Sequence, residues 1–301
     1  MNFEYLKLNK ETRLVPNIGC PIEAPSTPYI YNPLFEDLDL NCILWPVEVP
    51  RGTLKEYLEA AKQMDLKMLV VTMPYKSEII PLLDEVDETS RIFRSVNTVK
   101  IQNGKTFGTG MDGKGCLAAL QKNKVKMKGA KVLMLGAGAI TGVIGRELAL
   151  AGVRELTIVN RTLEKADFVA DILRKNTSGM EIYTMEMTRE NLDAAARDKD
   201  LMLQCTSMGF KGSGRDYDYV DFIENLPGHA VVLDVITNPP RTRIIKKADA
   251  CGLKIIYGIN MLLGQAGEII EYVFGEKPSE AALEKSKQEW ARYAGVNLDS
   301  I

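Results

Sequence analysis

The feature that most constrains the fold of this chain is the alternation of short apolar runs with segments of helical period. Early in the chain, residues 42–49 and 67–72 are expected to be strands, and residues 53–64 and 77–83 are expected to be helices. This alternation is typical of a parallel sheet with helices packed on its faces. The sequence therefore predicts an α/β protein.

A second series of the same kind begins after Asp112. It contains expected strands at 131–135, 155–159, 201–205, 230–234 and 253–257, and an expected helix at 140–151. From Met261 the pattern is helical almost to the end, with a break at Gly275 and Pro278. We predict a substrate-binding catalytic domain at 1–112, completed by helices within 259–301. A doubly wound, Rossmann-type nucleotide domain at 113–258 would lie across a cleft from it.

Composition narrows the class of protein. The net charge is −2 without a concentrated basic stripe, so no nucleic-acid partner is expected. No apolar run reaches the roughly 18 residues of a membrane span, and the start carries no secretory signal. The five cysteines are scattered, which favours reduced thiols in a cytoplasmic protein over a disulfide or metal framework. The single histidine, His229, lies in a turn before an apolar strand and is not expected to carry the chemistry.

A glycine-rich turn joins the expected strand at 131–135 to the following helix, and it reads Gly136-Ala137-Gly138-Ala139, with Gly142 further on. Gly136 would permit the tight turn, and Gly138 would let the backbone approach a pyrophosphate at the helix N-terminus. The spacing is one residue longer than the usual dinucleotide fingerprint. A plain strand-to-helix turn is the alternative interpretation.

The end of the next strand indicates which dinucleotide is bound. An NAD enzyme places an acidic residue there to hold the ribose hydroxyls, but this chain has Asn160-Arg161-Thr162, with Lys165 close behind. A planar guanidinium and an ammonium suit the 2′-phosphate of NADP, which an acidic residue would repel. NADP is therefore expected and NAD is less favoured. The alternative is that Arg161 and Lys165 are solvated charges at the start of a helix.

With these residues in view, the chain resembles the shikimate dehydrogenase family along nearly its whole length. The resemblance rests on blocks that occur in the family's order, namely Gly19-Cys-Pro-Ile22 with Pro28 and Asn32, Val71-Thr72-Met-Pro74-Tyr-Lys76, Ser95-Val-Asn97-Thr98-Val, Gly108 with Asp112, Gly113 and Gly115, Asn160-Arg161-Thr162, Thr206-Ser207-Met208-Gly209, Asp234 with Asn238-Pro239, and Gly258 with Met261-Leu262 and Gln265-Ala266. The lysine block and the Asn-Arg-Thr block are the most specific of them.

The resemblance implies an NADP-dependent oxidoreductase that interconverts 3-dehydroshikimate and shikimate, or the corresponding quinate pair. Lys76 would exchange the proton of the reacting hydroxyl, and Asp112 would orient that hydroxyl and the ammonium. The substrate's other groups would be held by Thr27, Thr72, Asn97 and Gln265, and the cofactor also by Thr206, Met208 and Gly258. From the residues alone, Lys76 could instead be a surface lysine after a strand, and Asp112 a helix cap.

The chain departs from the family pattern mainly where the substrate carboxylate would be held. The family offers two hydroxyl side chains in this loop, and the matching positions here are Pro25 and Thr27, so one donor is lost. Ser26 could replace it if the loop follows another path. Tyr31 stands where the family commonly has histidine, and Thr237 where it commonly has tyrosine. The Asn-Thr that normally precedes the aspartate is Gly110-Met111 here.

These departures leave the substrate open. The leading hypothesis is a dehydrogenase of shikimate or quinate, a small cyclic hydroxy acid, working as a monomer or homodimer. A dehydrogenase of a different cyclic hydroxy acid or polyol on the same scaffold is the second hypothesis. A ligand-sensing relative without turnover is the third, although a sensor has no need for the proton-handling pair.

Overall fold

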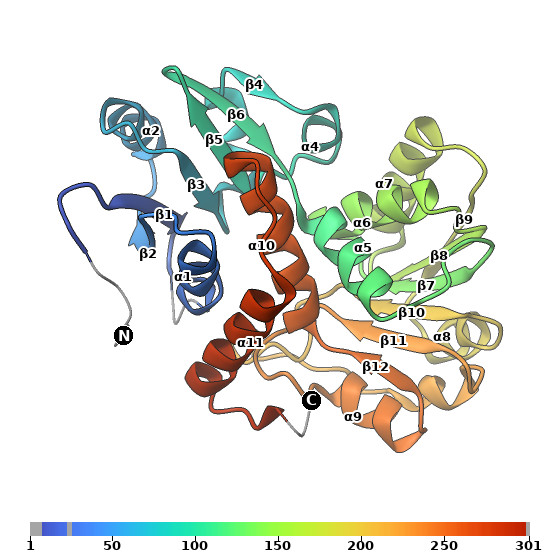
Figure 1. Cartoon of the computed structure of the whole chain (residues 1–301). Coiled ribbons are helices and arrows are strands. Elements are labelled where there is room, and N and C mark those ends of the chain that lie inside the picture. Colours follow the sequence, from blue (N-terminus) through green and yellow to red (C-terminus); the bar gives the residue numbers. More distant parts are fainter. Residues whose placement is uncertain (1–7, 23–25, 299–301) are drawn as a thin grey trace. The chain divides into compact units, whose positions relative to one another are not determined.

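The computed structural model describes residues 8–22 and 26–298 and divides the chain into two compact units (Figure 1). The first unit comprises residues 1–111 and 266–300, and the second comprises residues 112–265. Helix α10, Gly258–Phe274, begins in the second unit and ends in the first. Each unit contains a six-stranded sheet with helices on it, so the predicted α/β class is confirmed.

The sheet of the first unit has the strand order β2-β1-β3-β5-β6-β4. Its strands are β1 (Arg13–Gly19), β2 (Cys42–Glu48), β3 (Met68–Val71), β4 (Glu85–Val86), β5 (Thr98–Gln102) and β6 (Lys105–Thr109). Strands β1, β2 and β3 are parallel, while β5 runs antiparallel to both β3 and β6. The sheet is therefore mixed, and the expectation of a parallel sheet here is wrong.

The physical reason for the mixed sheet is a tight hairpin between β5 and β6. Asn103 and Gly104 form its two-residue turn, with φ angles of 53° and 72°. Positive φ at both central residues defines the hairpin turn that suits the twist of the strands, and Asn-Gly is its preferred sequence. The Asn-Gly pair between two strand-forming runs is the sequence signal for this hairpin.

The helices of the first unit are α1 (Thr27–Asp37), α2 (Leu54–Gln63), α3 (Tyr75–Glu78), the 3-10 helix η1 (Ile80–Leu82), α4 (Glu88–Phe93) and α11 (Glu280–Ala294). The helix expected at 77–83 is wrong, because Pro81 lacks the N–H that would continue an α-helix from α3. Helix α1 is fixed to β2 by the buried side chain of Asn32. Its Oδ1 accepts from the Leu44 N–H at 2.7 Å, and its Nδ2 donates to the Leu44 carbonyl at 3.3 Å.

The sheet of the second unit is entirely parallel, with the strand order β12-β11-β10-β7-β8-β9. Its strands are β7 (Lys131–Leu135), β8 (Glu155–Asn160), β9 (Glu181–Glu186), β10 (Leu201–Gln204), β11 (Val231–Asp234) and β12 (Lys254–Ile256). The chain winds outward from β7 to β9 and then returns to place β10 beside β7. This is the doubly wound order, and its switch point lies between β7 and β10.

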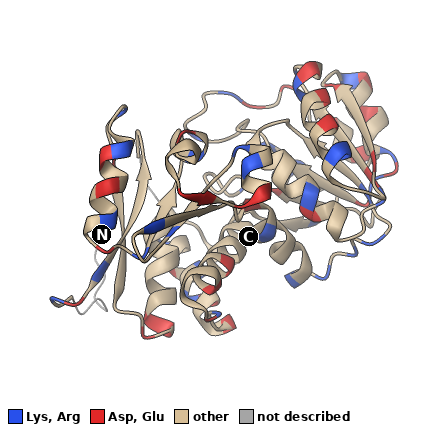
Figure 2. Cartoon of the chain, turned by 90° about the horizontal axis from the view of Figure 1, so that it is seen from above, with Lys and Arg blue, Asp and Glu red and all other residues tan. Residues whose placement is uncertain are grey.

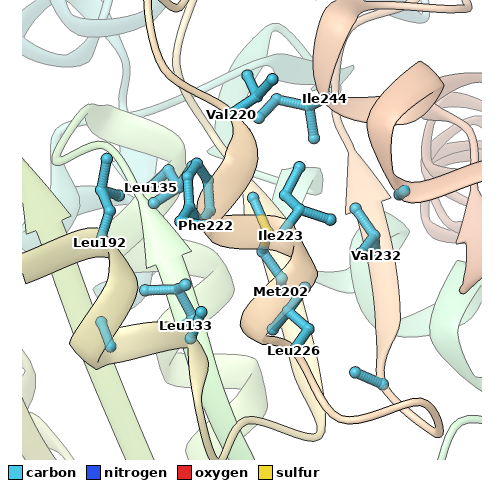
Figure 3. Close-up of a cluster of buried hydrophobic side chains, with 14 of the residues drawn as sticks. Leu133, Leu135, Leu192, Met202, Val220, Phe222, Ile223, Leu226, Val232 and Ile244 are labelled. Atoms are coloured by element: carbon cyan, nitrogen blue, oxygen red, sulfur yellow. The ribbon is translucent and has the colours of Figure 1, made fainter. Parts of the chain in front are cut away.

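Helices cover both faces of this second sheet (Figure 1). They are α5 (Asp112–Lys122), α6 (Ala139–Leu150), α7 (Leu163–Asn176), α8 (Arg189–Ala196), the 3-10 helix η2 (Asp221–Asn225) and α9 (Arg243–Ala250). On the face that carries α8, η2 and α9, apolar side chains from the strands and these helices form one buried cluster, including Leu133, Met202, Phe222 and Val232 (Figure 3). Because both faces are covered, the central strands β7, β10 and β11 are buried along nearly their whole length, whereas the outer strand β9 keeps exposed residues.

The charged residues are mixed over the surface, and the cysteines form no disulfide. Figure 2 shows Lys and Arg interspersed with Asp and Glu along the helices of each unit. All five cysteines are free thiols, and Cys42, Cys116 and Cys205 are buried. Within residues 8–22 and 26–298, no helix has the length and apolar character needed to cross a membrane, and no group of three or more side chains is placed to hold a metal ion.

Candidate active site

The glycine-rich turn lies at the switch point of the second sheet, where β7 and β10 end side by side. Gly136 has a φ of +105°, a conformation that L side chains rarely adopt. A Cβ at this position would lie 2.8 Å from Thr206 Cγ2 and 3.1 Å from the Cys205 carbonyl oxygen. Gly136 therefore permits both the turn and its close approach to the loop after β10. The structure brings the predicted residues Gly136 and Thr206 together.

Gly138 precedes the first residue of α6 and differs from Gly136. Its φ of −86° suits any residue, and a Cβ there would meet no atom within 4 Å. The free N–H groups at the start of α6 and the helix dipole favour an anion in this open space. Among the described side chains, none caps the start of α6. Ala137 and Ala139 complete the turn, and the contact of this segment with a phosphate stays a prediction.

The segment after β8 carries exposed positive charge. Asn160 Nδ2 donates to the Thr162 carbonyl at 2.8 Å, and the Lys165 N–H donates to the same carbonyl at 3.2 Å. These bonds shape the turn that leads into α7. Arg161 and Lys165 are exposed, and neither side chain forms an ion pair or hydrogen bond with another described residue. A guanidinium without a partner among residues 8–22 and 26–298 can pair with a phosphate group.

The loop after β10 rests on a buried polar network that the sequence analysis missed. Gln204 is fully buried, and its Oε1 accepts from the Thr206 N–H at 2.5 Å. Its Nε2 donates to the carbonyls of Thr206 and Met208 at 3.2 and 3.3 Å. The Tyr217 hydroxyl contacts Gln204 Oε1 at 3.2 Å and Thr206 Oγ1 at 3.0 Å. An amide within an apolar run was the available signal.

Asp234 extends this network at the end of β11. Its carboxylate accepts from Thr242 Oγ1 at 2.6 Å and from the Ile236 N–H at 2.9 Å. Burial is the main cause that raises the pKa of Asp234 to about 6, and these hydrogen bonds oppose the shift. The network thus fixes the two loops that follow β10 and β11, which carry Thr206, Met208 and the segment leading to Thr237.

Gly258 starts α10 and lies against the backbone that follows β11. A Cβ there would lie 2.5 Å from the Ile236 carbonyl oxygen and 2.7 Å from the Val235 backbone. Only glycine allows this packing, because backbone atoms cannot move aside as a flexible side chain can. The structure gives Gly258 a packing role, and its contact with a cofactor stays a prediction.

Asp112 and Gln265 meet within the second unit. Asp112 is buried at the first residue of α5, and its Oδ1 accepts a hydrogen bond from Gln265 Nε2 at 2.5 Å. The close approach depends on glycines, because a Cβ at Gly115 would lie 2.7 Å from Gln265 Cβ, and one at Gly264 would lie 2.7 Å from the Gly115 carbonyl oxygen. The structure thus joins a predicted catalytic residue to a predicted substrate-binding one.

In the first unit, the predicted site residues gather at one end of the strands. Strands β1 and β3 have their carboxyl ends there, and β5, which is antiparallel to β3, begins there. Thr72 follows β3, Lys76 lies on α3 four residues later, and Asn97 precedes β5. The backbone joins them, since the Val71 N–H donates to the Asn97 carbonyl at 2.8 Å and the Val96 N–H donates to the Lys76 carbonyl at 2.8 Å.

The side chain of Asn97 is only half satisfied by the residues that the structure describes. It is 3% exposed, and its Oδ1 accepts from the Met111 N–H at 3.0 Å and from Thr98 Oγ1 at 3.1 Å. Its Nδ2 is buried without a hydrogen-bond partner among the described residues. A buried donor without an acceptor is costly. Asn97 Nδ2 is therefore a donor without an acceptor among the described residues, and its contact with a substrate stays a prediction.

The substrate loop is described in part. Pro25 lies outside the described residues. Ser26 precedes α1 without capping it through its side chain, and Thr27 Oγ1 accepts a 2.6 Å hydrogen bond from Asn17 Nδ2. Asn17, on β1, is a second residue that the sequence analysis missed. Its signal was a polar side chain between buried apolar neighbours in the run Leu14-Val-Pro-Asn-Ile18.

His229 lies at the amino ends of the strands of the second sheet, opposite to the carboxyl ends that carry the predicted cofactor residues. It precedes β11 by two positions, and its Nε2 lies 2.9 Å from Asp200 Oδ1 just before β10. The predicted site residues of the second unit lie at the carboxyl ends of the strands or on α5 and α10. The exposed histidine is therefore placed for a surface hydrogen bond with Asp200.

Comparison with known proteins tests the family. Residues 18–99 match the shikimate dehydrogenase substrate binding domain, and residues 118–209 match the family described as shikimate / quinate 5-dehydrogenase. A protein of Alkaliphilus metalliredigens named shikimate dehydrogenase (NADP(+)) is 34% identical over 270 residues, which are 90% of this chain and 94% of that protein. The chain belongs to the shikimate dehydrogenase family. The predicted resemblance is confirmed.

Solved structures share the fold of this chain. Shikimate 5-dehydrogenase from Listeria monocytogenes, in complex with shikimate and NAD, is 25% identical with a TM-score of 0.84 and covers 94% of this chain and 97% of its own. Ligand-free 5-ketofructose reductase of Gluconobacter sp. strain CHM43 is 27% identical with a TM-score of 0.81 and covers 93% and 99%. The chain is thus similar both to a solved protein named for shikimate and to one named for 5-ketofructose.

Proposed function

We propose that this member of the family is an NADP-dependent shikimate dehydrogenase that interconverts 3-dehydroshikimate and shikimate. The observation that carries the proposal is the set of fixed polar side chains, above all Asn97 Nδ2 of the first unit, which has no partner among the described residues, and the Asp112–Gln265 pair of the second. Several oriented hydrogen-bonding groups are what a polyhydroxylated ring requires. Membership of the family and the relative's name supply the substrate class.

The residues present fit NADP. Gly136 to Ala139 and the start of α6 would hold the pyrophosphate, because Gly138 borders open space and no described side chain caps the helix. Arg161, with Asn160, Thr162 and Lys165 beside it in the chain, would hold the 2′-phosphate. Bound there, NADP supplies the acceptor or donor of hydride. Thr206, Met208 and Gly258 complete the proposed cofactor site.

The protein's own contribution is the handling of a proton. Oxidation of a secondary alcohol requires the proton to leave its oxygen, and we propose that Lys76 Nζ takes it and returns it in the reverse direction. Asp112 would orient the same hydroxyl, with its carboxylate held by Gln265. Thr27, Thr72, Asn97 and Gln265 would fix the other substituents of the ring. Orientation of this kind makes the proton transfer effectively intramolecular.

A panel assay tests the proposal. Purified protein is mixed with NADP and with shikimate, quinate or a set of cyclic polyols, and absorbance of the reduced cofactor is followed. The reverse reaction with the reduced cofactor is run on 3-dehydroshikimate and on 5-ketofructose. Turnover that is highest with the shikimate pair supports the proposal, and turnover confined to neutral polyols would overturn it.

The second candidate, a dehydrogenase of a neutral polyol or another ring acid, has specific support. Position 25 is proline, which removes one donor from the loop expected to hold the carboxylate. The likeness to 5-ketofructose reductase shows that the scaffold is also found in a protein named for an uncharged substrate. The panel separates the two candidates directly.

A further inference from the structure

The contact between Asn17 and Thr27 has a feature that packing does not explain. Asn17 is 4% exposed on β1, and its Nδ2 donates to Thr27 Oγ1 at 2.6 Å. Its Oδ1 is buried without a hydrogen-bond partner among the described residues. An aliphatic side chain would fill the same strand position without leaving a polar atom unsatisfied. The amide is therefore a cost to folding that function has to explain.

Asn17 lies near the carboxyl end of β1, at the end of the sheet where the site residues of the first unit gather. It pairs with Val70 on β3, which pairs with Thr98 on β5. Residues paired in this way share one face of the sheet. Asn17 therefore lies on the face that Thr98 shares, two residues from the end of β1. On this face its amide reaches Thr27, the first residue of α1.

The direction of the hydrogen bond determines what Thr27 can do. A hydroxyl has one proton to donate and lone pairs to accept with. Because the Asn17 amide donates to Thr27 Oγ1, the threonine keeps its own proton for another acceptor. Among the described residues, Thr27 Oγ1 has no other hydrogen-bond partner. The amide thus holds Thr27 as an outward donor, which is the arrangement that a carboxylate requires.

We propose that Asn17 is a positioning residue that determines specificity for an acidic substrate, by orienting the Thr27 hydroxyl toward the substrate carboxylate. This inference rests on the proposed function. It gives a reason for the loss of a hydroxyl at position 25, because a donor held in one direction needs less support from a second one. Asn17 acts through Thr27, so removal of its amide matters only while the Thr27 hydroxyl is present.

A double-mutant cycle tests the proposal. Asn17→Leu replaces the amide by an aliphatic group of similar size, and Thr27→Val removes the hydroxyl. Asn17→Leu is expected to raise KM for shikimate about five- to tenfold, with kcat and KM for NADP changed less than about twofold, since a lost directed donor weakens substrate binding. In the Thr27→Val background, the same change is expected to alter KM less than about twofold.

Matched variants exclude a merely structural effect. Ser286 is buried in the same unit and donates to the Ile30 carbonyl of α1 at 2.9 Å, so Ser286→Ala removes a buried support of α1 and should leave KM unchanged. Thr27→Ser keeps the hydroxyl and should keep the response to Asn17→Leu. If Asn17→Leu does not fold, Asn17→Asp serves instead. It can only accept from Thr27, and it should raise KM for shikimate more than KM for the neutral methyl ester.

The outcomes are distinct. Additive effects of Asn17→Leu and Thr27→Val, or a KM for shikimate that Asn17→Leu leaves within twofold of the wild type, overturn the role of Asn17 and leave the proposed function standing. Equal changes with shikimate and its methyl ester under Asn17→Asp also overturn it. A wild-type protein without turnover of shikimate overturns both the proposed function and this inference.

Discussion

The two units prepare their sites by different physical means. At the switch point of the second sheet, the proposed contacts to the cofactor come from backbone N–H groups beside Gly138 and from exposed charges such as Arg161. In the first unit, the proposed contacts to the substrate come from buried side chains at the carboxyl ends of β1 and β3, and Asn17 Oδ1 and Asn97 Nδ2 are left without partners among the described residues.

The difference teaches what each kind of ligand demands. A pyrophosphate is recognised by helix dipole and N–H groups, so glycine and open space suffice. A ring with several hydroxyls needs donors and acceptors in fixed directions, which buried side chains provide at a cost in stability. Changes at the switch point of the second sheet should therefore act on cofactor affinity, and changes to the buried polar side chains of the first unit should act on turnover or substrate affinity.

Lys76→Met should show the largest difference between an effect on turnover and an effect on cofactor affinity. It should lower kcat by roughly 10²- to 10⁴-fold, because it removes the proposed proton carrier, and should leave the Kd for NADP unchanged. Stopped assays give kcat, and fluorescence titration gives Kd. The exposed Lys55→Met on α2 is the matched control. A Lys76 variant that keeps more than about a tenth of the wild-type kcat would remove this lysine from the mechanism.

Asp234 provides a test based on stability in the second unit. Because burial raises the pKa of Asp234 from 3.8 to about 6, the folded state binds this proton more tightly than the unfolded state. Its contribution to stability is full below about pH 4 and is lost as the pH rises through about 6, by at most about 3 kcal/mol at 1.36 kcal/mol per pKa unit.

Asp234→Asn should therefore make the free energy of unfolding fall less, or rise more, than in the wild type between pH 4.5 and 7. Urea denaturation at several pH values measures this slope, and the exposed Asp218→Asn is the control. Parallel slopes for Asp234→Asn and the wild type would show that the buried carboxyl does not titrate in this range.

Arg161→Ala should weaken NADP binding by about one to two decades and leave NAD binding nearly unchanged. The reason is that a hydrogen bond to a charged group contributes about 1.5–3 kcal/mol, and only NADP carries the phosphate. Titrations with both dinucleotides, repeated on Lys165→Ala, measure the difference. Equal losses for the two cofactors would assign Arg161 a structural role.

Gly138→Ala should have the smallest effect, about a tenfold rise in the Kd for NADP with little change in thermal stability. The added methyl group meets no protein atom within 4 Å and the φ of −86° is ordinary, so only a bound ligand would sense it. Gly136→Ala is the counterpart and should also lower stability, because its φ is +105°. A stability loss shared equally by both would indicate that Gly138 is structural as well.

Much of this organisation was readable in the sequence, because it depends on local patterns. The apolar runs at β7, β8, β10 and β11 predicted buried parallel strands. Gly136 indicated the tight turn after β7, and Arg161 indicated the positive charge after β8. The Asn103-Gly104 turn is an equally local pattern, and the antiparallel hairpin that it forms is the reason why the expectation of a parallel first sheet is wrong.

What the tertiary structure decided are the contacts between residues far apart in the chain. Nothing near Gln204 in the sequence indicates that its side chain forms hydrogen bonds with both Thr206 and Asp234. Nothing near Asp112 indicates that Gln265 donates a hydrogen bond to it, at a contact between helices that two glycines allow. In the sequence, Asn17 is only a polar residue within an apolar run. The fold gives its amide a partner, the Thr27 hydroxyl. Periodicity reveals which face of an element is buried, whereas the partner of a buried polar atom depends on how distant elements pack.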